Sequence, residues 1–161
     1  MSDKIYLFTD GSVHPQSGMG FGAFLLIEDH ATSAEEAKNL VQVKKFENTS
    51  STKLELQILL HALVKFEKRK EHVIVCTDSQ NIVGLLGRRD CLEKNDYRSK
   101  SGKLISNCEL YQEFYKITDL LNCQIVKVKG HQKSSHKNKM DSFFTLVDRA
   151  ARNALREVNF S

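Results

Sequence analysis

The sequence lacks the features that mark membrane-spanning, secreted and disordered chains. Its longest unbroken apolar run is the five residues from Ala23 to Ile27, against the roughly 20 needed to cross a bilayer. Residues 1–4 lack the basic-then-apolar order of a signal peptide. With one proline, no tryptophan, 40% hydrophobic and 27% charged residues, collagen-like and disordered classes are excluded. We therefore expect a cytoplasmic protein without membrane association.

Cysteine motifs and domain linkers are absent as well. The cysteines at positions 76, 91, 108 and 123 form no Cys-x-x-Cys pair, which disfavours a zinc or redox motif and favours reduced, mostly buried thiols. No repeat, linker or biased tract divides the 161 residues, a length typical of one domain. We expect a single domain over residues 1–161 that is monomeric.

Positive charge is concentrated in two segments. The formal net charge is +4, but residues 88–103 carry 6 basic and 3 acidic groups, and residues 127–140 carry 5 basic and 0 acidic groups. The rest of the chain is therefore acidic. Clustered basic residues suit a polyanionic partner such as a nucleic acid, although a solvated basic loop accounts for the charge equally well.

Hydrophobic periodicity predicts an α/β domain. The segment order βββαβααβα, in which the first three strands form an antiparallel meander, predicts a mixed five-stranded sheet flanked by helices. The expected strands are 4–9, 18–27, 40–46, 73–77 and 124–129, with a turn over 11–18, and the expected helices are 52–66, 80–86, 108–121 and 141–158.

Three glycines, Gly18, Gly20 and Gly22, recur with period two along the second expected strand. Residues with this period share one face of a strand. A face without side chains predicts that another element approaches the backbone closely.

Helix starts carry recognisable capping residues. Thr52 followed by Glu55 fits the capping-box pattern at the first long helix. Ser79, Asn107 and Asp141 precede the other three helices and are of types that cap helix N-termini.

Four acids occupy positions that are unusual for charged side chains. Asp10 ends the first expected strand and Asp78 ends the fourth, and open α/β sheets bind ligands beside such strand ends. Asp148 lies on an otherwise apolar helix face, and Glu55 begins the first long helix. Taken singly, each acid has an ordinary explanation as a turn, cap or surface residue. Taken together, they indicate a crevice lined by carboxylates.

Such a crevice predicts bound metal, because close carboxylates raise one another's pKa unless a cation is present. Mg²⁺ takes oxygen ligands and keeps several waters. Two metal ions about 4 Å apart can activate a water and stabilise the leaving oxygen of a phosphoryl displacement. An acidic metal site flanked by basic segments therefore indicates a nuclease.

Five segments carry these acids and their neighbours in a characteristic order. They are Phe8–Ser12 (FTDGS), Ser51–Leu56 (STKLEL), Cys76–Gln80 (CTDSQ), Val128–His131 (VKGH) and Leu146–Ala151 (LVDRAA). Together they resemble the type 1 ribonuclease H family over nearly the whole chain. The resemblance implies the ribonuclease H-like fold and endonucleolytic hydrolysis of the RNA strand of RNA–DNA hybrids by a two-metal-ion mechanism. It also implies 5′-phosphate and 3′-hydroxyl products and two Mg²⁺ ions, with Mn²⁺ as a possible substitute.

The resemblance also assigns residues. The catalytic set it implies is Asp10, Glu55, Asp78, His131 and Asp148, of which the four acids bind metal. The choice between His131 and His136 stays open, because the interval between His131 and Asp148 is longer than usual in the family. The implied substrate contacts are Gly11, Ser12, Ser50, Ser51, Thr52 and Gln80, with Gln80 reading the minor groove.

Two departures from the family bear on substrate binding. The basic segment 88–103 matches a protrusion that is rich in tryptophan in well-known bacterial members, yet it has Tyr97 and no tryptophan. Ser51 and Thr52 replace a pair of amides. The alternatives are a related nuclease acting on DNA or branched substrates and a non-catalytic hybrid-binding module.

Overall fold

The computed structural model describes all residues except 1–3, 29–30, 69–70, 129–138, 159 and 161. Its centre is a single sheet with the strand order β3-β2-β1-β4-β5. Strands β1, β2 and β3 form an antiparallel meander, while β4 and β5 are parallel to β1. The predicted mixed five-stranded sheet is confirmed. The strands are β1 (Lys4–His14), β2 (Met19–Ile27), β3 (Gln42–Phe46), β4 (His72–Thr77) and β5 (Cys123–Lys127).

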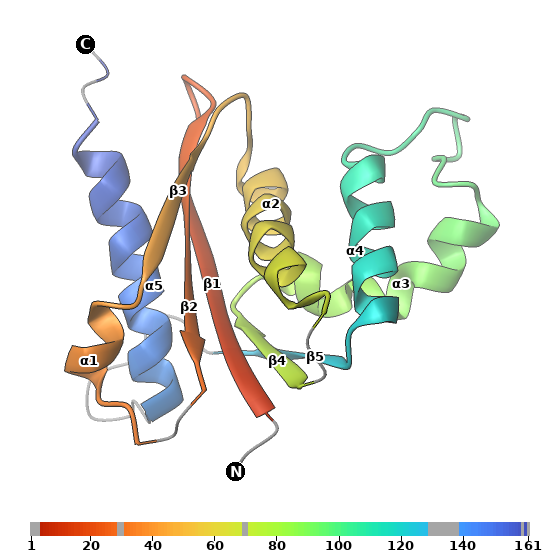
Figure 1. Ribbon diagram of the computed structural model, residues 1–161. Coiled ribbons are helices and arrows are strands. Elements are labelled where there is room, and N and C mark those ends of the chain that lie inside the picture. Colours follow the sequence, from red (N-terminus) through yellow and green to blue (C-terminus); the bar gives the residue numbers. More distant parts are fainter. Residues whose placement is uncertain (1–3, 29–30, 69–70, 129–138, 159, 161) are drawn as a thin grey trace.

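Helices cover both faces of the sheet (Figure 1). On one side lie α2 (Ser51–Leu63), the short 3₁₀ helix η1 (Val64–Phe66), α3 (Gln80–Lys94) and α4 (Cys108–Leu120); on the other lie α1 (Ala34–Lys38) and α5 (Lys139–Arg156). Helix α1 was not predicted from the sequence. The sequence does contain a helix-start signal here, since Ser33 and Glu36 have capping-box spacing. In the structure the Ser33 hydroxyl accepts a hydrogen bond from the Glu36 N–H.

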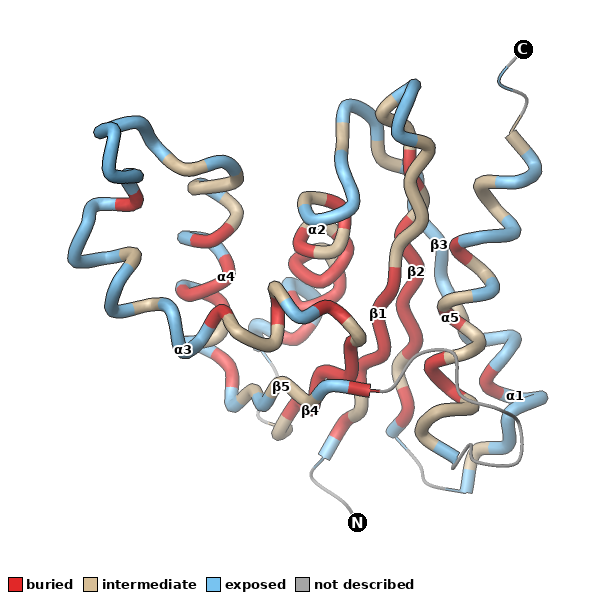
Figure 2. Tube along the Cα trace, turned by 180° about the vertical axis from the view of Figure 1, so that it is seen from behind, coloured by how far each residue is buried: buried red, intermediate tan, exposed pale blue. Residues whose placement is uncertain are grey.

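Two hydrophobic cores follow from the alternation of side chains along the strands. Leu7 and Val75 belong to the cluster packed under α2 and α4, whereas Phe8 and Cys76 belong to the cluster packed under α5. Buried residues accordingly concentrate on β1, β2, β4 and the inner helix faces (Figure 2). Because the sheet is covered on both sides, its central strands form a rigid base for the residues at their ends.

The first hairpin is longer than predicted. Strand β1 continues past Asp10, and its pairing with β2 runs to His14 opposite Met19. The expected turn over 11–18 is therefore wrong, and only residues 15–18 form the turn. Within this extension Gly11 pairs with Gly22, and the absence of side chains at both positions lets α2 pack closely on the hairpin.

The prediction of a close approach to the β2 glycines is confirmed at two of the three positions. A Cβ at Gly22 would lie 2.6 Å from Ile58 Cβ, and one at Gly20 would lie 2.8 Å from Leu54 Cδ2. Both partners belong to α2. Gly18 has a different role, because its φ of +73° places it in the turn.

Two capping predictions are wrong. The N-cap of α2 is Ser50, whose hydroxyl accepts from the Lys53 N–H, so Thr52 and Glu55 do not form a capping box. Helix α5 already begins at Lys139, which places Asp141 inside the first turn. Helix α2 begins one residue and α5 two residues before the predicted start, so each expected cap falls within the helix.

Of the other two predicted caps, Ser79 is confirmed and Asn107 is right in position only. The Ser79 hydroxyl accepts from the Ile82 N–H at the start of α3. Asn107 occupies the N-cap position of α4, but it has a left-handed backbone and its side chain makes no capping bond. Helix α3 runs to Lys94, beyond the predicted end at residue 86.

The described residues also bear on membranes and thiols. No helix among them has both the length and the apolar character that a membrane span requires. The four cysteines are free thiols as expected, but the expectation that most of them are buried is wrong, because only Cys76 is buried.

Candidate active site

The parallel pairing of β1 and β4 places two of the predicted acids side by side. The register aligns Phe8 with Cys76, and two residues further along the two strands lie Asp10 and Asp78. Asp78 directly follows β4, as predicted. Asp10 lies within β1 rather than at its end, since the β1–β2 hairpin extends beyond the β1–β4 pairing.

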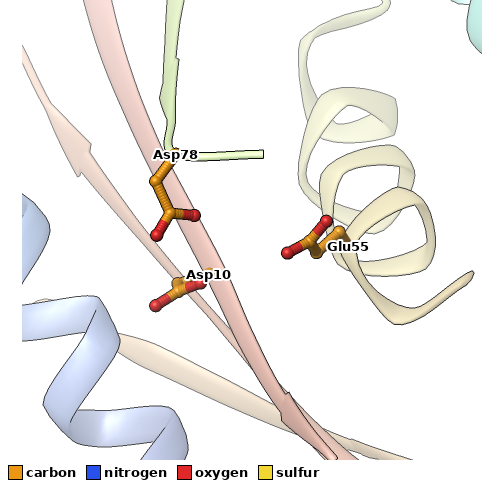
Figure 3. A group of neighbouring side chains, drawn as sticks. All are labelled: Asp10, Glu55 and Asp78. Carbon is orange, nitrogen blue, oxygen red and sulfur yellow. The ribbon is translucent and has the colours of Figure 1, made fainter. Parts of the chain in front are cut away.

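Helix α2 supplies the third acid from the other side of the cleft. Glu55 lies between the buried residues Leu54 and Leu56, and packing of these neighbours fixes the side of the helix on which Glu55 projects. Figure 3 shows the carboxyl groups of Asp10, Glu55 and Asp78 pointing into one space. One carboxylate oxygen from each lies within 4.8 Å of the others.

Helix α5 contributes the fourth acid. Asp148 lines the same cleft as the other three, forms a hydrogen bond with Asp10 and pairs with Arg152 at 3.1 Å between Oδ1 and Nε. The cleft has a volume of about 570 Å³. The tertiary structure thus brings all four predicted acids together, while their catalytic roles stay predictions.

The environment of Asp10 disfavours negative charge. Its side chain is buried, with 8% of its surface exposed. Burial raises its pKa most, followed by the Asp78 charge and the hydrogen bond with Asp148, so that the pKa reaches about 8 despite an opposing bond from the Gly11 backbone. Without a cation, this carboxyl is therefore protonated at neutral pH.

Glu55 shows the same tendency. Burial raises the pKa of its carboxyl, the Ser79 hydroxyl lowers it through a hydrogen bond, and the Asp78 charge raises it. Since Ser79 also caps α3, one buried hydroxyl connects this helix to the acid cluster. The cluster as a whole is arranged to receive positive charge.

The donor set fits a hard divalent cation. Four carboxylates line the cleft, and none of the described residues that line it is a histidine or cysteine. Oxygen-only donors favour Mg²⁺, Mn²⁺ or Ca²⁺ over softer metals. Asp10, Glu55 and Asp78 are the residues close enough together to share an ion.

The predicted substrate contacts divide into two groups. Thr52 is exposed on the first turn of α2, and Gln80 is exposed at the start of α3; neither lines the cleft. His131 and His136 lie outside the described residues, and the open choice between them stays a prediction. The predicted contacts that do line the cleft are Gly11, Ser12, Ser50 and Ser51.

Some residues that line the cleft were not predicted from the sequence. Arg152 is the one cation among the described lining residues, and its spacing of four from Asp148 is a signal that could have identified it. Val13 and Pro15 also line the cleft, because β1 extends beyond its predicted end.

The basic segment 88–103 is less available than its charge suggests. It includes the second half of α3 and the exposed connection to α4 (Figure 2). Arg89 makes a bidentate pair with Asp119 and a further pair with Glu93, so its charge is largely matched. Tyr97 is only 8% exposed and is not positioned to stack on a base. Lys100 and Lys103 are exposed and can still attract phosphate.

Comparison with known proteins places this chain in a family. The family model described as RNase H matches residues 2–156. A ribonuclease H of Acetivibrio thermocellus is 29% identical over 147 residues, which cover 88% of this chain and 92% of that protein.

Solved structures with the same fold include two viral proteins. The solution structure of the PFV RNase H domain matches with a TM-score of 0.71 at 17% identity, covering 96% of each chain. A foamy viral protease–reverse transcriptase in complex with an RNA/DNA hybrid matches with a TM-score of 0.72 at 11% identity. That match covers 96% of this chain and 20% of the viral chain. At these identities the similarity shows the fold alone.

Proposed function

This chain belongs to the RNase H family and is a ribonuclease H enzyme, and from this we propose that it hydrolyses the RNA strand of RNA–DNA hybrids endonucleolytically. The observation that carries the proposal is the cleft in which Asp10, Glu55, Asp78 and Asp148 meet. The hybrid in complex with the foamy viral relative of the same fold supports the choice of substrate.

The proposed cofactor is Mg²⁺, with Mn²⁺ as a substitute and two ions per site when substrate is bound. The four acids of the cleft would hold the ions. When bound, two such ions supply an activated water and stabilisation of the leaving oxygen, giving 5′-phosphate and 3′-hydroxyl ends.

Residues of the chain itself control the proton on Asp10 and hold the other acids in position. Asp10 must release its proton to act as a ligand, because only the ionised carboxylate binds metal well. Arg152 pairs with Asp148 and keeps part of the negative charge of the cleft compensated. The Ser79 hydroxyl holds Glu55 through its hydrogen bond.

Substrate recognition is proposed for the rim of the cleft. The hydroxyls of Ser12, Ser50 and Ser51 line it and can hydrogen-bond to sugar and phosphate oxygens. Contact with a 2′-hydroxyl is the physical means of distinguishing RNA from DNA. Gln80, just beyond the cleft, is proposed to contact base edges in the minor groove.

The test compares an end-labelled RNA–DNA hybrid, a DNA duplex, an RNA duplex and a branched junction of equal length, each with and without Mg²⁺. We expect Mg²⁺-dependent cleavage of the RNA strand of the hybrid alone. Asp10→Asn should lower the rate by at least about 100-fold, because one of the clustered ligands is lost. Preferred cleavage of a DNA substrate, or full activity of Asp10→Asn, would contradict the proposal. Hybrid binding without cleavage would indicate a binding module.

A further inference from the structure

A lysine and a glutamine from different elements meet beside the acid cleft. Gln80 is the first residue of α3, two positions after Asp78. Lys127 is the last residue of β5 and is paired with Thr77 at the end of the β4–β5 ladder. The Lys127 ammonium donates a hydrogen bond to Gln80 Oε1 at 2.8 Å.

Both backbones are firmly held. Beyond the ladder pair, the Val128 N–H donates to the Thr77 carbonyl at 2.9 Å, so the strand is anchored on both sides of Lys127. On the other side, the Ser79 cap fixes the start of α3. The contact between the two side chains therefore does not depend on a loop.

The chemistry of the contact determines how the amide lies. An ammonium group can only donate hydrogen bonds, whereas a glutamine amide has an accepting end and a donating end. Lys127 thus selects the orientation in which the Gln80 carbonyl oxygen points toward the ammonium group and the NH₂ group points away from it. Within the described part of the chain, Lys127 forms no ion pair that would draw its ammonium away.

This orientation matters for reading a nucleic acid. In the minor groove, A·T and T·A pairs present only acceptors, adenine N3 and thymine O2. An NH₂ group facing these atoms makes a hydrogen bond, whereas a carbonyl facing them leaves two acceptors in contact and unpaired. The lysine charge also polarises the amide and strengthens its N–H donors.

We propose that Lys127 is a positioning residue that fixes the Gln80 amide with its NH₂ group toward the base edges of the bound hybrid. The proposal rests on the proposed function, since it assumes that a hybrid lies across the acid cleft. It adds a residue outside the cleft to the set that determines recognition.

The experiment uses RNA–DNA hybrids in which one adenine of the DNA strand is replaced by 3-deazaadenine, which has carbon in place of the N3 acceptor. Moving this substitution along the strand and mapping the cleavage positions shows whether one acceptor is read. With wild-type protein, cleavage at one fixed distance from the substitution should fall about tenfold, the effect of one lost hydrogen bond.

Four variants separate orientation from other roles. Lys127→Met and Gln80→Ala should cleave the unmodified hybrid more slowly and should not respond to 3-deazaadenine. Lys127→Arg should keep the response, because it still only donates. The double variant, Lys127→Met with Gln80→Ala, should cleave the hybrid no more slowly than Gln80→Ala alone. Lys116→Met, on the exposed surface of α4, is the matched control and should behave as wild type.

Three outcomes would overturn the inference. If the Lys127→Met and Gln80→Ala defects multiply, the lysine contacts the substrate independently, for example at a phosphate. If Lys127→Met keeps the wild-type response, the amide does not need the lysine. If wild-type protein cleaves the hybrid without responding to any substitution, Gln80 reads no N3 acceptor, while the proposed function still stands. Failure of wild-type protein to cleave any hybrid would instead refute the proposed function.

Discussion

Replacing Asp10 by asparagine should stabilise the metal-free protein at neutral pH, even though the same change should abolish cleavage. Burial, the Asp78 charge and the hydrogen bond with Asp148 raise the Asp10 pKa from 3.8 to about 8. Below pH 3.8 the carboxyl is protonated in both the folded and the unfolded chain. Between pH 3.8 and about 8 only the unfolded chain releases the proton, so the free energy of unfolding falls as the pH rises. An asparagine side chain has no such dependence.

The size of the effect follows from this interval. At about 1.4 kcal/mol per pH unit, the rise from 3.8 to neutral pH costs the folded protein on the order of 4 kcal/mol. For a chain of this length, a change of 1 kcal/mol shifts the unfolding midpoint by roughly 2–4 °C. The asparagine variant should therefore melt roughly 10 °C higher than wild type at about pH 7.

The assay is urea and thermal unfolding of wild type and Asp10→Asn in EDTA at several values from about pH 4 to about pH 9. The stability difference should grow with pH and level off above about pH 8. The control is Asp90→Asn, which changes an exposed carboxylate on α3. A difference that does not vary with pH, or a wild type that is more stable at neutral pH, would refute the reasoning.

Adding Mg²⁺ gives a second measurement on the same pair. Metal binding releases protons from its ligands and stabilises the folded state that binds it. Mg²⁺ should therefore raise the midpoint of wild type more than that of Asp10→Asn. Equal shifts in the two proteins would show that Asp10 is not a ligand.

Further substitutions test the packing and capping of the helices around the cleft. Gly22→Ala should destabilise the protein by about 1–3 kcal/mol, because the new Cβ would lie 2.6 Å from Ile58 Cβ. Gly87→Ala should instead stabilise helix α3 by about 0.5–1 kcal/mol, because a Cβ there would meet nothing within 4 Å. Urea unfolding measures both changes. Ser79→Ala should lower the free energy of unfolding by about 1 kcal/mol, because it removes the hydrogen bond to the Ile82 N–H, whereas Ser79→Thr should keep most of this stability. If Ser79→Ala lowers the stability no more than the replacement of an exposed serine does, the capping interpretation is wrong.

The candidate site could be predicted largely from local sequence signals. Asp10 and Asp78 each follow a hydrophobic strand segment, and their alignment follows once β1 and β4 are parallel. Asp148 was identified because an acid on an apolar helix face needs a partner. Glu55 was found as part of a capping box that the structure does not contain, so its membership rested on the family resemblance.

Two of the errors lie where the β1–β2 hairpin meets α2. The extension of β1 beyond Asp10 and the early start of α2 both occur where the hairpin and the helix pack closely, with Gly20 and Gly22 facing the helix. Local propensity does not contain this contact. The small helix α1 was missed although its Ser33 cap follows an ordinary local rule.

The sequence by itself determined the fold class, the order of the strands and long helices along the chain, and the acids Asp10, Asp78 and Asp148, because periodicity and acids at strand ends or on an apolar helix face are local properties of the chain. Glu55 was assigned through the family resemblance. Only the tertiary structure decided how close the acids come, which of them is buried, that Arg152 lines their cleft and that Lys127 contacts Gln80. Distances between elements depend on strand register and helix packing. These are set by contacts between residues far apart in the sequence, and so is the protonation of Asp10, which depends on burial and on the neighbouring Asp78 and Asp148.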